Sequence, residues 1–122
     1  MEIDNALRDA MELDGAVGVA LVDYDSGMTL GAVGGNTILD LEVAGAANTE
    51  VVRAKMRAIS SLQLDDQIED ILITLSKQYH IIRPVNEARG ARLFLYLVLD
   101  RQRANLALAR HNLRRIEQAI TV

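Results

Sequence analysis

Cysteine and tryptophan are missing from this chain, and its aromatic side chains are limited to three tyrosines and one phenylalanine. Without cysteine the chain has no disulfides and no thiolate metal sites, which agrees with a reducing cytoplasm. With so few aromatic rings, it offers few platforms on which nucleobases can stack. Half of the residues are hydrophobic, so the core must be mainly aliphatic.

Basic charge is also in short supply, because the net charge is -4 and the pI is about 5.1. A nucleic-acid-binding protein usually carries a basic patch or stripe, so we expect no nucleic-acid partner. No apolar run approaches the ~18 residues that a membrane span needs, so we expect no membrane insertion. The first fifteen residues are acidic and amphipathic, unlike a signal peptide, which favours a cytoplasmic location.

The hydrophobic pattern predicts one domain, residues 1–122, with three helices and five strands. The expected helices span residues 2–14, 40–62 and from about 101 onward, and the expected strands span 16–22, 28–33, 68–75, 79–85 and 93–99. Gly15 is a plausible helix stop, Asp40 a candidate N-cap, and Gly27 suits a hairpin turn. Pro84 is expected to end strand pairing, because proline has no N–H.

Two of these strands, 16–22 and 93–99, are apolar throughout, which indicates that both of their faces are covered. They should therefore lie in the middle of the sheet, with 28–33 at an edge because its glycines weaken it. Short connections make neighbouring strands antiparallel. The sequence thus predicts an α+β fold, a three-layer α/β/α sandwich around a five-stranded antiparallel sheet in the order αββαβββα.

The helix expected at 40–62 has two apolar stripes where a surface helix normally has one. One stripe consists of Ala47, Val51, Ala54 and Ala58, and the other of Leu41, Gly45, Val52, Met56 and Ile59. Asn48 and Lys55 lie between them, and Glu42, Thr49, Arg53, Arg57 and Ser60 are expected on the far side. Two stripes imply two packing partners, of which one is the chain's own sheet and the other is a candidate second subunit.

Motifs that would indicate enzymatic chemistry are not found. The sequence contains neither GxxxxGK[ST] nor GxGxxG, and the glycine-rich stretch 31–35 is not followed by a lysine that would hold a phosphate. His80 and His111 have no second histidine or cysteine at ligand spacing. The carboxylates clustered at residues 65–70 lack the spacing of a calcium loop and fit a solvated turn better. We therefore expect no catalytic residue, no metal and no cofactor.

Arg53, Lys55 and Arg57 on the second helix are the candidate contacts to a partner protein. An exposed arginine can anchor an interface or stabilise the transition state of a GTPase, although a solvated face is the simpler interpretation. Lys55 lies between two apolar stripes, where its stem can cover apolar surface while its amine reaches solvent or an acidic partner.

Taken together, four segments resemble the roadblock/LC7 domain family. They read GAVGVALVDYDSGMTLG, EVVRAKMRAI, IEDILITLSKQYHIIRP and FLYLVLDRQRANLALAR, and the resemblance runs from about residue 15 to 119. It implies a profilin-like fold of the order given above. The C-terminal helix resembles the bacterial members of the gliding-motility type and actinobacterial members encoded beside a small GTPase.

This resemblance implies a non-enzymatic regulator or scaffold that binds a small Ras-like GTPase. It also implies a homodimer formed through the second helix and third strand. The residues that correspond to that interface are Val52, Met56, Ile59, Ile68, Ile71, Ile73 and Leu75. Two other functions stay open: a small-molecule-binding sensor, which would need a polar and aromatic cavity, and a purely structural dimeric scaffold.

Overall fold

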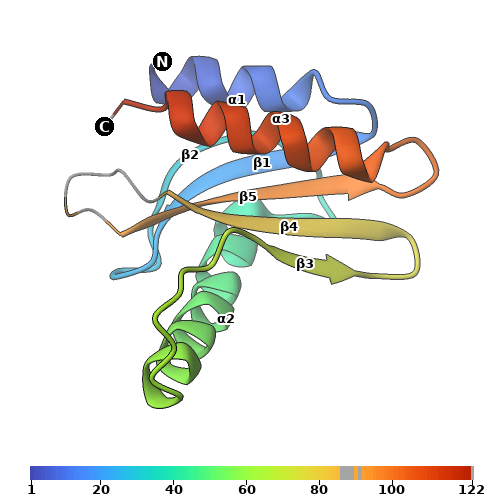
Figure 1. Ribbon diagram of the computed structural model, residues 1–122. Coiled ribbons are helices and arrows are strands. Elements are labelled where there is room, and N and C mark those ends of the chain that lie inside the picture. Colours follow the sequence, from blue (N-terminus) through green and yellow to red (C-terminus); the bar gives the residue numbers. More distant parts are fainter. Residues whose placement is uncertain (86–89, 91, 122) are drawn as a thin grey trace.

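The computed structural model describes residues 1–85, 90 and 92–121 and has three layers (Figure 1). Helices α1 and α3 lie side by side over one face of the sheet, and α2 lies against the other face. The elements in chain order are α1 (Ile3–Met11), β1 (Ala16–Asp23), β2 (Thr29–Gly34), α2 (Leu41–Ser61), β3 (Ile71–Thr74), β4 (Gln78–Val85), β5 (Leu93–Asp100) and α3 (Leu106–Ala119). The predicted order αββαβββα is confirmed.

The sheet has the strand order β2-β1-β5-β4-β3, and every neighbouring pair is antiparallel. The two apolar strands β1 and β5 lie next to each other, with Val19 opposite Leu97 and Ala20 opposite Tyr96. β5 is the central strand, and its residues from Leu93 to Leu99 are all buried. β2 is an edge strand, as predicted, and β3 is the opposite edge.

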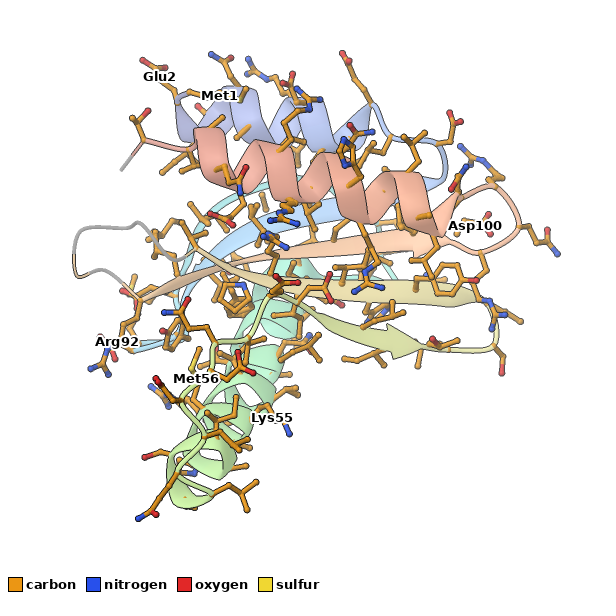
Figure 2. All side chains as sticks on the ribbon, viewed as in Figure 1. Met1, Glu2, Lys55, Met56, Arg92 and Asp100 are labelled. Carbon is orange, nitrogen blue, oxygen red and sulfur yellow. The ribbon has the colours of Figure 1, made fainter. Side chains whose placement is uncertain are left out.

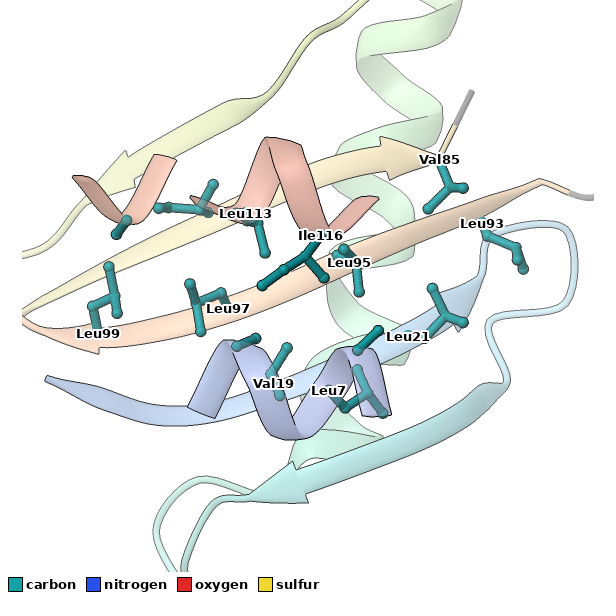
Figure 3. Close-up of a cluster of buried hydrophobic side chains, with 14 residues drawn as sticks. Leu7, Val19, Leu21, Val85, Leu93, Leu95, Leu97, Leu99, Leu113 and Ile116 are labelled. Carbon is teal, nitrogen blue, oxygen red and sulfur yellow. The ribbon is translucent and has the colours of Figure 1, made fainter. Parts of the chain in front are cut away.

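Two hydrophobic clusters fill the spaces between the layers. On the α1 and α3 side, Leu7, Leu113 and Ile116 cover Val19 and Leu97 (Figure 3). On the α2 side, the cluster contains Val52, Ile82, Phe94, Tyr96 and Val98. Because successive residues of a strand point to opposite faces, β5 contributes its odd-numbered residues to the first cluster and its even-numbered residues to the second.

Local signals explain where most elements begin and turn. The Asp40 carboxylate accepts hydrogen bonds from the N–H groups of Glu42 and Val43, at 3.0 and 3.3 Å, which makes it the N-cap of α2. Gly27 has a φ of 78° in the β1–β2 turn, where a side chain would be strained. Gly15 has a φ of 81°, but α1 has already ended at Met11, and a turn connects the two.

Besides the end of α1, two predicted boundaries and the predicted effect of Pro84 were wrong. The last helix begins at Leu106, capped by the Asn105 side chain, because residues 101–103 form a turn instead of the first helical turn. β3 is only four residues long, shorter than the predicted 68–75. Pro84 does not end its strand, since the β4–β5 ladder continues through Val85. The proline lies beyond the last β3–β4 pair, Ile71 with Ile82, so the N–H that it lacks is not needed there.

Two polar residues of the helices are buried, of which Thr49 was predicted on the far side of its helix. Thr49 faces the sheet, and its hydroxyl donates a hydrogen bond of 2.8 Å to the carbonyl of Gly45, one turn earlier in α2. Glu117 on α3 is buried in an ion pair with Arg83 of β4. In both cases the polar atom finds a partner within the protein, which makes its burial tolerable.

Candidate interaction surface

One of the two apolar stripes of α2 is exposed. The stripe made of Ala47, Val51, Ala54 and Ala58 faces away from the sheet, and it continues at the start of the helix with the exposed Val43. The other stripe packs on the sheet through Leu41, Gly45 and Val52, which are buried. The sheet is therefore one of the two expected packing partners, and the second partner stays a prediction.

A groove runs between the exposed stripe of α2 and the segment that leads into β3. It encloses about 780 Å³ and is lined by Val51, Ala54, Lys55, Ala58, Gln67, Ile68, Glu69, Asp70 and Ile71. Its floor and helical wall are aliphatic, and its polar groups are one amine, one amide and two carboxylates at the rim. Such a composition suits a protein partner with apolar side chains and complementary rim charges.

β3 continues this surface as a short, open edge. Ile71 and Ile73 are only partly buried and pack against the α2-side cluster, and Leu75 just beyond the strand is exposed. An edge strand leaves unpaired N–H and C=O groups on its outer side, which another strand can pair with. The groove and the edge therefore form one continuous surface, here called the α2–β3 surface.

An ion pair that sequence reasoning missed fixes one wall of the groove. Arg110 of α3 donates two hydrogen bonds to the two carboxylate oxygens of Asp70, at 2.9 and 2.8 Å. Hydrogen bonding and the charge of Asp70 raise the pKa of Arg110 above its ordinary value. The two residues are forty positions apart, so no local pattern in the sequence indicates the contact. It ties the strand leading into β3 to the far helix layer.

The predicted interface residues do not all lie on this surface. Ile68, Ile71, Ile73 and Leu75 do, since they belong to the groove or to the β3 edge. Met56 and Ile59 are partly buried, and Met56 packs against the α2-side cluster. Val52 is fully buried in the α2-side core, so its assignment to a subunit interface was wrong. Its stripe is the one that the sheet covers.

The three candidate cations separate onto two flanks of α2. Lys55 lines the groove, and Figure 2 shows its side chain projecting below β3. Arg57 is exposed on the opposite flank, close to the position of Arg53 one turn earlier. Arg53 is held by the β1–β2 turn, because its guanidinium donates to the backbone carbonyls of Tyr24, at 2.8 Å, and of Asp25. Arg53 therefore has a structural role that the sequence did not indicate.

A polar cluster lies on the α2 side of the sheet, next to the α2–β3 surface. The ring of His80 accepts a hydrogen bond from the Tyr96 hydroxyl at Nδ1, 3.0 Å, and donates from Nε2 to the Gln78 side chain, 2.9 Å. Burial lowers the pKa of His80, so the neutral ring is favoured. Burial also raises the pKa of Tyr96, and a side-chain hydrogen bond with Asn48 opposes that rise.

Within the residues that the structure describes, no group of three or more histidine, aspartate or glutamate side chains is arranged to hold a metal ion. Of the described helices, none is both long enough and apolar enough to cross a membrane.

Comparison with solved structures places the fold. The chain superimposes on a roadblock/LC7 domain from Streptomyces avermitilis with a TM-score of 0.81, at 9% identity, over 98% of this chain and 94% of that one. For Myxococcus xanthus MglB the TM-score is 0.72 at 19% identity, over 93% of this chain and 77% of that one. For the gliding protein MglB from Thermus thermophilus the TM-score is 0.68 at 18% identity, over 94% of this chain and 87% of that one. Another similar structure shows MglB in a tetrameric arrangement.

In sequence alone, no protein-family model and no curated protein matches the chain. The structural likeness is nevertheless close over nearly the whole length, so the chain has the roadblock/LC7 fold. This confirms the fold that the resemblance implied. Its structural neighbours include bacterial gliding proteins, the type that the C-terminal helix had indicated.

Proposed function

We propose that this protein is a non-enzymatic regulator or scaffold that forms a homodimer and binds a small Ras-like GTPase. The observation that carries the proposal is the α2–β3 surface, an exposed apolar helix stripe beside an open strand edge, on a roadblock/LC7 fold. The sequence lacks a phosphate-binding loop of its own. A role in GTPase signalling therefore requires a partner that supplies the nucleotide site.

A second copy is the occupant that best suits the α2–β3 surface. Ala47, Ala54 and Ala58 leave a flat stripe along α2, which lets another helix approach closely, as small residues do in packed helix pairs. The outer side of β3 takes an antiparallel strand. About a two-fold axis the same surface contributes both sides of the contact. Lys55 of one subunit then lies over the acidic rim that contains Glu69 of the other.

Dimerisation is tested with two matched alanines of α2. Ala54→Glu places a charge in the groove, where it is desolvated on pairing, so the variant should lose association through the α2–β3 surface and sediment as a smaller species than the wild type. Ala46 is exposed on the other flank of the same helix, and Ala46→Glu should keep the association state of the wild type. Sedimentation velocity measures both, with circular dichroism as the check of folding. A wild-type chain that is monomeric at micromolar concentration contradicts the dimer.

The GTPase contact is assigned to the flank that carries Arg57, because pairing through the groove covers Lys55. Arg57→Glu should weaken binding of a Ras-like GTPase, measured by calorimetry with the GDP-bound and GTP-analogue-bound forms. Arg114→Glu is the control, since Arg114 is exposed on α3 in the opposite layer. Exposed charges contribute little to folding, so both variants should fold. If neither nucleotide state binds the wild-type dimer, a purely structural scaffold becomes the better reading.

A ligand-binding sensor is the second candidate, because the groove has a volume within the range of small-molecule sites. Its lining is partly aliphatic and partly charged, and no aromatic side chain takes part. Thermal shift with a panel of small metabolites separates the two functions. A ligand that stabilises the wild type but not Ala54→Glu favours the sensor.

A further inference from the structure

The second edge of the sheet, β2, is unusually bare. Its sequence TLGAVG contains no charge and no proline, which are the features that usually protect an edge strand from pairing. Its residues alternate between partly buried and exposed, and Leu30 is 49% exposed. β2 lies at the opposite end of the sheet from β3, so it takes no part in the α2–β3 surface.

The hydrogen bonds of β1 show which backbone groups of β2 face outward. The N–H of Gly35 donates to the carbonyl of Val17, at 2.9 Å, and Val19 is opposite Val33. Because bonding alternates along an antiparallel pair, the N–H and C=O groups of Ala32 and Gly34 point away from β1. They form a row of donors and acceptors with which another extended chain can pair.

One face of α1 is directed toward the β2 edge of the sheet. Met11 packs over Gly34, since a side-chain carbon added at Gly34 would lie 2.7 Å from the Met11 Cε. Asp4 and Arg8 are exposed and lie seven and three residues before Met11, which puts all three on the same side of the helix. An acid and a base are thus displayed one turn apart along the open edge.

A hollow of about 470 Å³ lies beside the same strand on its α2 side. It is lined by Ala32, Gly34, Gly35, Asn36, Thr37, Leu39, Asp40, Leu41 and Glu42. The glycines leave it open over the end of β2, while Leu30 projects near the other end. When a second β2 lies antiparallel beside the first, the exposed leucine of each strand lies next to the hollow of the other. The hollow and the leucine are then complementary.

We propose that β2 pairs antiparallel with β2 of a second copy, about a two-fold axis that passes through Ala32. This register places outward backbone groups opposite each other, Ala32 with the partner's Ala32 and Leu30 with the partner's Gly34. Leu30 of each subunit then enters the hollow of the other. The strand is uncharged, so no like charges meet within the new ladder.

The helix layer supports the same arrangement. α1 packs on both β1 and β2, so its axis lies slightly inside the edge. In the paired arrangement, the distance between the two α1 axes is the separation of the two β2 strands, about 4.8 Å, plus this offset in each subunit. The sum is about 10 Å, a typical packing distance between two helices. Since the helices run antiparallel, Asp4 faces the partner's Arg8 and Arg8 faces the partner's Asp4. This charge complementarity selects a second copy over an unrelated extended peptide.

The interface at β2 is separate from the α2–β3 surface, so together the two interfaces link dimers end to end into tetramers and longer oligomers. Ala32→Pro tests it, because the proline removes an outward N–H and leaves the β1–β2 ladder intact. Sedimentation velocity over a concentration series should show species larger than a dimer, growing with concentration, for the wild type and a dimer for Ala32→Pro. Ala54→Glu should also be a dimer, paired through β2, and the double variant a monomer.

Charge exchange on α1 gives a second, independent measurement. Arg8→Asp should weaken association at β2 by about tenfold, since two unlike pairs become two like pairs. Asp4→Arg with Arg8→Asp should restore it, which loss of folding would not do. Circular dichroism checks that each variant is folded.

The proposal is overturned if Ala32→Pro leaves the largest species unchanged, or if the wild type forms only a dimer that Ala54→Glu converts to monomers. A wild-type monomer–dimer equilibrium that Ala32→Pro abolishes and Ala54→Glu does not would support pairing at β2 and contradict the α2–β3 dimer. If Ala32→Pro abolishes association only with a different protein, the edge is assigned to an extended peptide instead of a second copy.

Discussion

Arg83 on β4 and Glu117 on α3 form an ion pair inside the α1 and α3 side of the protein, with 3.0 Å between Arg83 Nε and Glu117 Oε1. Their side chains are only 8% and 3% exposed. Removing one partner of a buried pair leaves the other charge without compensation. The pair therefore constrains which substitutions this part of the core accepts.

Glu117→Ala should lower the free energy of unfolding by about 3–5 kcal/mol, because the Arg83 guanidinium remains buried without its carboxylate. Replacing both residues together, as Arg83→Met with Glu117→Leu, should cost much less, since neither charge is then buried. Urea denaturation of the three variants measures the difference. Equal losses in the single and double variants would mean that packing, and not charge, dominates at this site.

Arg110→Lys should weaken dimerisation more than it weakens folding. A lysine cannot make the two parallel hydrogen bonds that Arg110 makes with Asp70, although it keeps the charge. Because Arg110 is about half exposed, the loss of unfolding free energy should be below about 1 kcal/mol. The segment leading into β3 should exchange its amide hydrogens faster. Unchanged exchange at residues 68–71 would show that the ion pair does not hold this wall.

Stability should fall in mild acid through His80. Its pKa in the folded state is lowered by burial below the ordinary 6.5, so above that value the ring is neutral in both states. As the pH falls below it, the unfolded chain binds a proton that the folded chain resists, and unfolding is favoured. His80→Gln should reduce the loss of stability between about pH 7.5 and pH 5. His111→Gln, a change at an exposed position, is the control.

Both faces of β5 should be equally sensitive to truncation. Leu97→Ala on the α1 and α3 side should cost about 2–5 kcal/mol, and Phe94→Ala on the α2 side about 3–5 kcal/mol. Leu97 and Phe94 are chosen because they belong to different clusters, on opposite faces of the strand. Thermal and denaturant melts of the two variants decide. A nearly neutral Phe94→Ala would mean that α2 covers its side of the sheet only loosely.

The continuous apolar runs of β1 and β5 were sufficient to predict their central, doubly covered positions. A strand that is covered on both faces has no position left for a polar residue that faces solvent. The capping side chain of Asp40 and the turn at Gly27 were also readable, since each acts on its immediate neighbours. These features are local, and local chemistry determines them.

The failures share a cause of the opposite kind. Glu117 looks like a solvent-facing residue until β4 brings Arg83 to it, and Thr49 looks like one until α2 packs on the sheet. Arg53 seemed free to meet a partner, yet the β1–β2 turn holds it from 29 positions away in the chain. The path of α2 across β1 and β2 likewise determines which of its two apolar stripes faces the sheet.

The last turns of α2 run past the edge of the sheet (Figure 1), and Leu62 and Leu64 are exposed at their end. A helix end with no sheet beneath it opens at a lower free energy than the rest of the domain. In the proposed homodimer, pairing through the groove raises that free energy by mass action. Unpaired copies should therefore be cut first at this end of α2 by a protease, while paired copies are protected.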